Sequence, residues 1–209
     1  MGVTERRERE REHRRAAIVA AATEVFAEHG LDGASMASIA RHAELGKASL
    51  YYYFDTKQAL FDAVLSQGMD RFFTELTDRH PPTGDLAAAV EDLLSFTVGF
   101  FQRERCLLRL MAPAMSHLHM TTAAPGTAHP GLAALSEGHT AYLTHLDQLV
   151  AASPWSDRPH QFLAFLTDVI VTLLHLLLTG GIAEAEARLG FYVDLIRGRT
   201  AATPTRSTP

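Results

Sequence analysis

Cysteine and tryptophan are nearly absent from this sequence, which has one of each among 209 residues. The single cysteine, Cys106, excludes an intramolecular disulfide and favours a reducing compartment. No stretch alternates polar and apolar residues with the period of two that a half-buried strand requires. Enzyme motifs such as G-x-S-x-G and H-E-x-x-H are also missing, so the sequence does not point to an enzyme.

Signals for export or membrane insertion are weak. The apolar run that begins at Ala16 has only seven residues and follows an acidic segment, whereas export signals are acid-poor and longer. Residues 162–179 form a longer apolar stretch, but Asp168 lies near its middle and no basic flank adjoins it. A helix that is apolar nearly all round is otherwise a deeply buried one. We therefore expect a cytoplasmic protein without membrane contact.

An overall excess of positive charge is lacking too, since the formal net charge is −5. Residues 1–57 carry nine basic and nine acidic side chains, whereas residues 58–209 carry ten basic and fifteen acidic ones. The acidic excess therefore belongs to the second part of the chain. A neutral N-terminal part can still bind phosphate where its basic groups gather locally.

The N-terminal pattern predicts three helices. Apolar residues recur at spacings of three and four over Ile18–Phe26, and we expect Gly30 to end this first helix. Residues 31–35 read as a turn, and Ser35 is a good N-cap for a short second helix. A tight turn then leads into a third helix over 47–53. Two short helices joined by a glycine-containing turn, packed on a longer helix, describe a helix-turn-helix.

The third helix contains an unusual run, GKASLYYYF, at residues 46–54. Successive residues of a helix step by about 100°, so Phe54 shares a face with Leu50 while Tyr52 points almost opposite. Leu50 and Phe54 are predicted core residues, and the opposite face is left for a partner. In a helix-turn-helix, the second short helix enters the major groove of DNA.

The remainder of the chain is expected to be helical, which makes the protein all-α. Glycine, proline and serine clusters separate the later helices, and a polar, proline-containing segment at the end reads as a disordered tail. The predicted later helices cover 85–103, 105–115, 131–151, 158–179 and 182–197.

Residues 14–66 resemble the TetR family of transcriptional regulators. The resemblance rests on F-x-x-x-G, a capped I-A pair, LYYYF and the TK and L that follow it. It implies a homodimer with an N-terminal three-helix DNA-binding domain and a larger helical domain that binds a ligand and dimerises. The predicted divisions are a charged tail (1–13), the DNA-binding domain (14–60), the effector and dimerisation domain (61–198) and the disordered tail (199–209).

The resemblance also implies which positions contact DNA. Lysine can bond guanine or phosphate, small side chains can pack on a thymine methyl, and tyrosine hydroxyls can reach phosphates. Ser35 is added because a helix N-terminus suits a phosphate. For Tyr51, packing between helices is an open alternative. The predicted DNA contacts are Ser35, Lys47, Ala48, Ser49, Tyr51, Tyr52, Tyr53 and Lys57.

Residues beyond about 70 are predicted from general physics and from the family's architecture. In this family the last two helices form a four-helix bundle with their symmetry mates, which implies that Leu166, Ile170, Leu173, Leu177 and Leu189 face the partner. A largely apolar effector needs an apolar lining with a few polar groups, with ordinary core packing as the alternative. The candidate lining residues are Phe96, Phe100, Met111, Met115, Trp155, Phe162, Phe165, Thr172 and His175.

Metal or redox sensing is an alternative that the sequence leaves open. His117 and His119 are close together, but no acidic residue occurs between 105 and 136, and Cys106 has only nearby arginines to activate it. We expect no metal and no cofactor.

The function expected is a ligand-responsive dimeric regulator that binds a palindromic double-stranded DNA operator and is released by a small molecule. A repressor is the expected form, and activation is an alternative that the sequence leaves open. The alternative from another class is a small-molecule binding protein or enzyme with a purely structural helix-turn-helix.

Overall fold

The computed structural model describes residues 2–79, 85–112 and 137–201. Within these ranges the chain is helical apart from turns and connections, which confirms the all-α fold class. A helical segment at 105–112 lies between α5 and α7. The helices are α1 (Val3–Gly33), α2 (Met36–His42), α3 (Lys47–Tyr53), α4 (Lys57–Arg79), α5 (Leu86–Arg103), α7 (Glu137–Ala151), α8 (Pro159–Thr179) and α9 (Ile182–Ala201).

The predicted helix positions agree well with these bounds, with one correction at the C-terminus. α9 continues to Ala201 and so enters the segment that was predicted as a disordered tail from residue 199. The physical reason is that the first proline of this segment is Pro204, so nothing before it removes a backbone donor. Residues 113–136 lie outside the described ranges, and the predicted helices over 105–115 and 131–151 are tested only in part.

α1 ends in a way that the sequence predicted only partly. Gly30 adopts φ 70° and ψ 176°, a conformation that favours glycine, and it interrupts the helix where the prediction ended it. The chain then makes one more helical turn as far as Gly33, and the Ala34 N–H donates to the Gly30 carbonyl at 3.2 Å. The turn predicted over residues 31–35 is therefore largely helical.

The connection from α2 to α3 is tight and hydrogen-bonded. The Leu45 N–H donates to the Ala40 carbonyl at 2.8 Å, and the Glu44 N–H donates to the Arg41 carbonyl at 3.2 Å. Glu44 carries the positive φ of this turn, 56°, whereas Gly46 has an ordinary extended conformation and caps α3. A residue other than glycine in this left-handed backbone conformation costs about 1 kcal/mol, which the surrounding packing must offset.

The N-terminal helices enclose their own core. Ile18 of α1, Ile39 of α2, Leu50 of α3 and Leu60 of α4 all have no exposed surface. Burial of each such side chain contributes about 1.5–3 kcal/mol. α3 is only seven residues long and is held by this core, because an isolated helix of that length is unstable in water.

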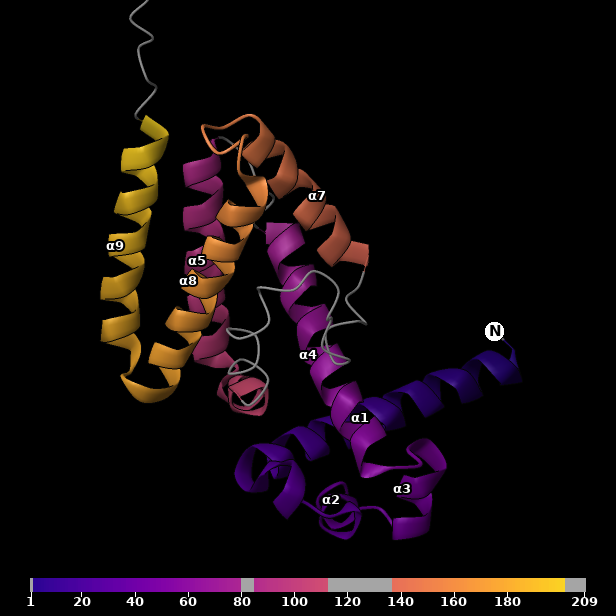
Figure 1. Ribbon diagram of the computed structural model, residues 1–209. Helices are drawn as coiled ribbons and strands as arrows, with labels where there is room; N and C mark the ends of the chain where they lie inside the picture. The colour runs from indigo at the N-terminus through magenta and orange to yellow at the C-terminus, as the bar shows by residue number, and fades with distance from the viewer. Residues whose placement is uncertain (1, 80–84, 113–136, 202–209) are drawn as a thin grey trace, which may run out of the picture.

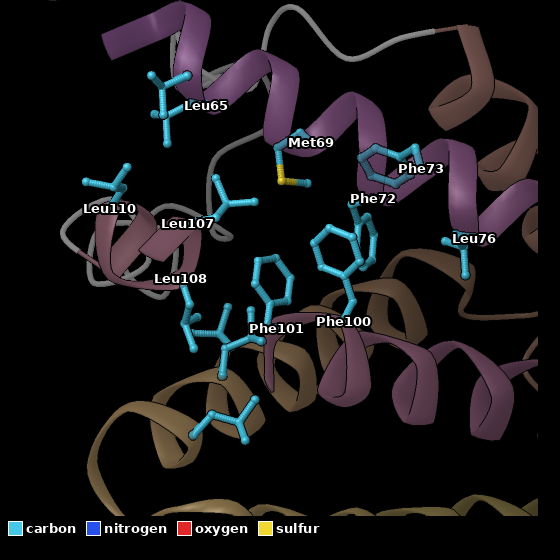
Figure 2. Packing of buried hydrophobic residues seen from close by; sticks show 14 of the residues in the cluster. Leu65, Met69, Phe72, Phe73, Leu76, Phe100, Phe101, Leu107, Leu108 and Leu110 are labelled. Carbon is cyan, nitrogen blue, oxygen red and sulfur yellow. The ribbon is translucent and has the colours of Figure 1, made fainter. Parts of the chain in front are cut away.

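α4 joins the N-terminal helices to the rest of the molecule (Figure 1). Its first turns pack on α1, and further along Phe72 lies against Phe100 and Phe101 of α5, with ring centroids 5.1 and 5.6 Å apart (Figure 2). Leu107 of the 105–112 segment packs so closely on Gly68 that a Cβ there would lie 2.5 Å from a leucine methyl. The domain boundary predicted at residue 60 falls inside this continuous helix and stays a prediction.

The C-terminal helices form a layered bundle in which α9 lies beside α5 and α8 (Figure 1). Arg105 ties the 105–112 segment to this bundle, since its guanidinium donates to the Leu177 carbonyl at 2.6 Å. Arg197 of α9 forms an ion pair with Glu91 of α5. The bundle is therefore closed by polar contacts at its rim and by apolar packing inside.

α8 is the described helix whose length and composition would allow it to cross a membrane, with a mean hydropathy of 2.1. Core helices of water-soluble proteins share these properties. Only 39% of its most apolar 18-residue window is buried within the chain, so much of this helix is left accessible to a partner.

Candidate nucleic-acid interface

α3 is oriented as the spacing of its residues predicted. Leu50 is fully buried and Phe54 is 4% exposed, which confirms both as core residues. The Gly46 backbone precedes the helix without a side-chain cap, and Phe54 leaves the helix in an extended conformation. The face opposite Leu50 is thus presented outward on a helix that is anchored from behind.

The exposed face of α3 gathers most of the predicted contacts. Lys47, Ala48 and Ser49 are exposed, Tyr51 is 41% exposed and Tyr52 is 69% exposed. Tyr52 is a large aromatic residue that the core does not bury, so most of its ring and its hydroxyl are accessible to a ligand.

Aromatic and cationic contacts fix the orientation of these tyrosines. Half-buried Tyr53 packs against the core and meets Tyr52 edge to face, with ring centroids 5.2 Å apart. The Lys47 ammonium lies 6.0 Å from the Tyr51 ring, and the Arg11 guanidinium lies 5.8 Å from the Tyr52 ring. Such cation–π contacts contribute about 0.5–1 kcal/mol at exposed sites. The outward surface is therefore partly ordered before any ligand arrives.

Ser35 is placed at the N-terminus of α2, as expected, but its hydroxyl is already engaged. The Ser38 N–H donates to Ser35 Oγ at 3.0 Å, and the Ser38 hydroxyl lies 3.0 Å from the same oxygen. The two serines form a reciprocal capping box, since the Ser35 N–H donates to Ser38 Oγ at 3.1 Å. Ser35 is exposed, so its predicted phosphate contact would add to this capping role.

Lys57 has a structural contact that the sequence did not reveal. Its ammonium donates to the Ala34 carbonyl at 2.9 Å and to the Asp32 carbonyl at 3.4 Å. The side chain thereby ties the start of α4 to the end of α1. Its position beside the α1–α2 connection could not be predicted, because Ala34 is 23 positions away in sequence.

A second contact missed by sequence reasoning joins α1 to α2. His42 Nε2 lies 2.7 Å from a carboxylate oxygen of Glu24. Both side chains are well exposed, so the pair adds little stability on its own. Its effect is to orient α2 on α1 next to α3.

The candidate effector residues fall into two aromatic groups. Phe96 and Phe100 pack on Phe72 between α4 and α5, whereas Trp155 and Phe162 pack together at 5.2 Å, where α8 begins. Phe165 continues the second group, Met111 and Thr172 are half-buried, and His175 is exposed. Met115 lies outside the described residues.

One crevice of about 660 Å³ opens beside α1, α4 and residues 104–107. It is lined by alanines of α1, Val64 and Leu107, together with acidic groups such as Asp70 and Glu104. Among the described candidate effector residues, none lines this crevice, so it is separate from the part of the predicted effector site that the structure describes.

The predicted dimer residues are largely covered within one chain. Leu166, Leu173 and Leu177 are buried, and Ile170 and Leu189 are half-buried. Side chains that are already buried add little to an interface, because no further surface leaves water. The large apolar side chains that stay exposed on the last helix are Ile182, Phe191 and Leu195.

The candidate sensor residues give no assembled site in the described part of the chain. His117 and His119 lie outside it. Cys106 is exposed at the edge of the crevice beside α4. Among the described residues, no three histidine, cysteine, aspartate or glutamate side chains are placed to share a metal ion.

Comparisons with known proteins agree with this geometry. The family described as "Bacterial regulatory proteins, tetR family" matches residues 18–64. The transcriptional regulator UidR from Escherichia coli is 29% identical over 101 residues, which are 48% of this chain and 52% of UidR. This chain thus spans about half the length of that curated relative. Matching proteins of this kind are transcriptional regulators, which are not enzymes.

Solved structures resemble the fold over nearly the whole chain. A TetR-like transcriptional regulator from Rhodococcus sp. RHA1 is 22% identical, has a TM-score of 0.64, and covers 88% of this chain and 94% of its own. The regulator FadR from Bacillus subtilis, solved with stearoyl-CoA, is 15% identical, has a TM-score of 0.65, and covers 85% and 97%. At these identities the likeness shows a shared fold. Residues 18–64 therefore match the family model described for tetR-type bacterial regulatory proteins, and the chain as a whole shares the fold of TetR-like structures.

Proposed function

We propose that this chain is a dimeric, ligand-responsive transcriptional repressor of the cytoplasm that binds a palindromic DNA operator. The observation that carries the proposal is the two-sided character of α3. Its inner face is anchored by fully buried Leu50, whereas Tyr52 projects outward with 69% of its surface exposed. A short helix held in this way is suited to enter a major groove without losing its own packing.

The proposed division of work on α3 follows from side-chain chemistry. Lys47 donates to guanine O6 and N7 or to a phosphate. Ala48, Ser49 and Tyr52 face base edges, where small side chains pack against a thymine methyl group. Tyr51, whose ring lies beside the Lys47 ammonium, donates its hydroxyl to the DNA backbone.

Dimer formation is supported by the unfilled apolar surface of the C-terminal bundle. Phe191 and Leu195 lie one helical turn apart on α9 and are 61% and 49% exposed. The apolar window of α8 is only 39% buried within one chain. A two-fold pairing over these helices places the two helix-turn-helix units on one face of the duplex, with half-sites about 34–36 Å apart.

The effector is proposed to be largely apolar. Its chemistry is supported by the aromatic groups of α4, α5 and α8, and by the resemblance in fold to FadR, which was solved with stearoyl-CoA. The dimer has conformations that differ in the distance between its two α3 helices. The effector releases DNA only if it binds more tightly to a conformation whose spacing does not fit the operator, since it shifts the equilibrium by that difference in affinity.

The test is a binding selection from a random-sequence duplex library, followed by anisotropy titration of the enriched site. We expect a palindrome, and we expect Tyr52→Ala to weaken binding to it by about 5- to 100-fold. The control is Gln148→Ala, because Gln148 is exposed on α7, which lies at the other end of α4 from α3 (Figure 1). Enrichment of no sequence would overturn the proposal and favour a binding protein whose helix-turn-helix is structural.

A further inference from the structure

The N-terminal arm of α1, residues 3–15, extends the helix beyond the core of the DNA-binding domain (Figure 1). Its described side chains are exposed, and at about 1.5 Å per residue it adds about 20 Å of helix. The first buried residues of α1 are Ile18 and Val19, so apolar packing does not explain the arm. An interaction outside the protein core is needed to account for its basic residues.

The arginines of this arm are not evenly distributed around the helix. At about 100° per residue, Arg7, Arg11 and Arg14 share one face, and Ile18 continues that face into the core. The α1 side that packs against the other DNA-binding helices is therefore apolar within the domain and cationic beyond it. Arg6 and Arg9 lie on the other side of the arm.

The cationic face borders the exposed end of α3. A groove of about 370 Å³ runs between the arm and α3, and Arg7, Arg11 and Arg14 line it together with Tyr52 and Tyr53. The Arg11 guanidinium lies 5.8 Å from the centre of the Tyr52 ring. The arm is thus placed beside the residue with the largest exposed ring on the reading face.

The charge on this face is unpaired by carboxylates. Among the described residues, no ion pair holds the guanidinium of Arg7, Arg11 or Arg14. Glu8 and Glu10 also border the groove, so the face keeps a cationic centre with acidic flanks. Its three free guanidinium groups match a row of phosphates better than a protein surface of mixed charge.

We propose that this arm is a second DNA-contacting surface, on which Arg7, Arg11 and Arg14 bind phosphates of the backbone that borders the major groove occupied by α3. This inference rests on the proposed function, since α3 must enter the groove for the arm to reach the adjoining backbone. Contacts of this kind to the DNA backbone position α3 in the groove and carry no sequence information themselves.

The role of each arginine depends on which side of the arm it lies, because arginines on both sides carry the same charge. Phosphates on one strand are spaced by about 3.4 Å along the axis, so an arm of this length covers several of them. Only the face that continues the α3 side can meet them while Tyr52 is in the groove. The arm therefore lengthens the DNA footprint beyond the bases that α3 reads.

The experiment compares two double variants of the full-length chain on the enriched operator and on an unrelated duplex. Arg7→Gln with Arg11→Gln removes charge from the groove face, and Arg6→Gln with Arg9→Gln removes the same charge from the other side. Glutamine supports a helix about as well as arginine, so both variants keep the arm helical. Circular dichroism checks this, and anisotropy is recorded at several salt concentrations.

The groove-face variant is expected to lose roughly 10- to 100-fold in affinity at 0.1 M salt on both duplexes. Its plot of log K against log salt is expected to be less steep by about two per protomer. The control variant is expected to lose much less. Equal losses in the two variants would overturn the proposal, because a general charge effect does not depend on the face.

The remaining outcomes separate the role of the arm from the proposed function. A loss that depends on the base sequence of the flanks would also overturn the proposal, since phosphates are the same in every sequence. If the unaltered chain enriches no site and binds no duplex, then the proposed function fails, and the arm's role fails with it. If the unaltered chain binds its operator and the two variants bind equally, only the role of the arm fails.

Discussion

Lys57 is a predicted DNA contact whose ammonium is already engaged by the fold. Its ammonium donates to the carbonyls of Ala34 and Asp32, which leaves it less free for a phosphate than Lys47, whose side chain is exposed. Hydrogen bonds from a charged donor contribute about 1.5–3 kcal/mol when both partners are well placed. We therefore assign Lys57 mainly to joining α1 and α4.

The consequence can be measured with Lys57→Met and Lys47→Met. The first change is expected to lower the free energy of unfolding by about 1–2 kcal/mol and to leave the salt slope of DNA binding nearly unchanged. The second is expected to leave stability within about 0.5 kcal/mol and to reduce the slope by about one. Urea unfolding and salt-dependent anisotropy give the two quantities. The reverse pattern would assign the phosphate contact to Lys57.

Single residues within α3 were well predicted from spacing, whereas contacts between distant residues were not. The burial of Leu50 and Phe54 follows from helical periodicity, which is a local property. The Lys57–Ala34 and His42–Glu24 contacts depend on how helices pack, and the sequence alone contains no comparable signal for them.

At the scale of elements, the α2–α3 turn holds a strained residue. Glu44 has φ 56°, a left-handed conformation that glycine adopts without the clash of a Cβ. Glu44→Gly is expected to stabilise the fold by about 0.5–1 kcal/mol, because the relief of strain exceeds the added freedom of the unfolded chain. Glu186→Gly, inside α9 and exposed, is the control and is expected to destabilise by about 1 kcal/mol. Thermal unfolding followed by circular dichroism reports both, and a lower melting temperature for Glu44→Gly would refute the strain argument.

The close crossing of α4 and the 105–112 segment depends on a glycine, Gly68, which has no side chain. Gly68 lies against Leu107, and a Cβ there would lie 2.5 Å from one leucine methyl and 2.6 Å from the other. Leu107 is 2% exposed, so it has little room to move. Close approach here sets how the 105–112 segment sits on the helix that leads to the DNA-binding domain.

Gly68→Ala is therefore expected to destabilise the protein by about 1–2 kcal/mol, although alanine favours a helix more than glycine does. Gly190→Ala is the matched control, because nothing lies within 4 Å of a Cβ at that exposed position of α9. That control is expected to stabilise by up to about 1 kcal/mol. Urea unfolding of both variants and of Gly68→Ala combined with Leu107→Ala measures the coupling. Equal gains in the two alanine variants would show that Leu107 moves away at no cost.

At the scale of the whole molecule, the exposed apolar surface of α8 and α9 makes a prediction about assembly. Phe191→Ser combined with Leu195→Ser is expected to raise the dissociation constant of the dimer by roughly 100-fold or more, because each change counts twice across a two-fold axis. Glu186→Ser, on another side of α9, is the control. Sedimentation equilibrium measures the association, and a dimer that tolerates both variants equally would place the interface elsewhere.

The sequence by itself determined the helical class and the anchored and free faces of α3, because both follow from periodicity within one element. It also carried the family pattern at residues 14–66, and the family model matches residues 18–64. It did not determine which side chains of α8 and α9 are left exposed, since Leu166, Leu173 and Leu177 were expected at an interface and are buried within the chain.

Tertiary structure decided these points because they depend on which helices become neighbours. A leucine on an almost wholly apolar helix can face the core or a partner equally well until α5 and α9 cover one side of α8. In the same way, the arginines before Ala16 belong to a mixed run of arginine and glutamate, which the sequence alone predicts as a solvated helix end, with a minor-groove contact as the alternative. Helical periodicity separates Arg7, Arg11 and Arg14 from Arg6 and Arg9, but only the packing of α1 beside α3 sets the first three next to Tyr52.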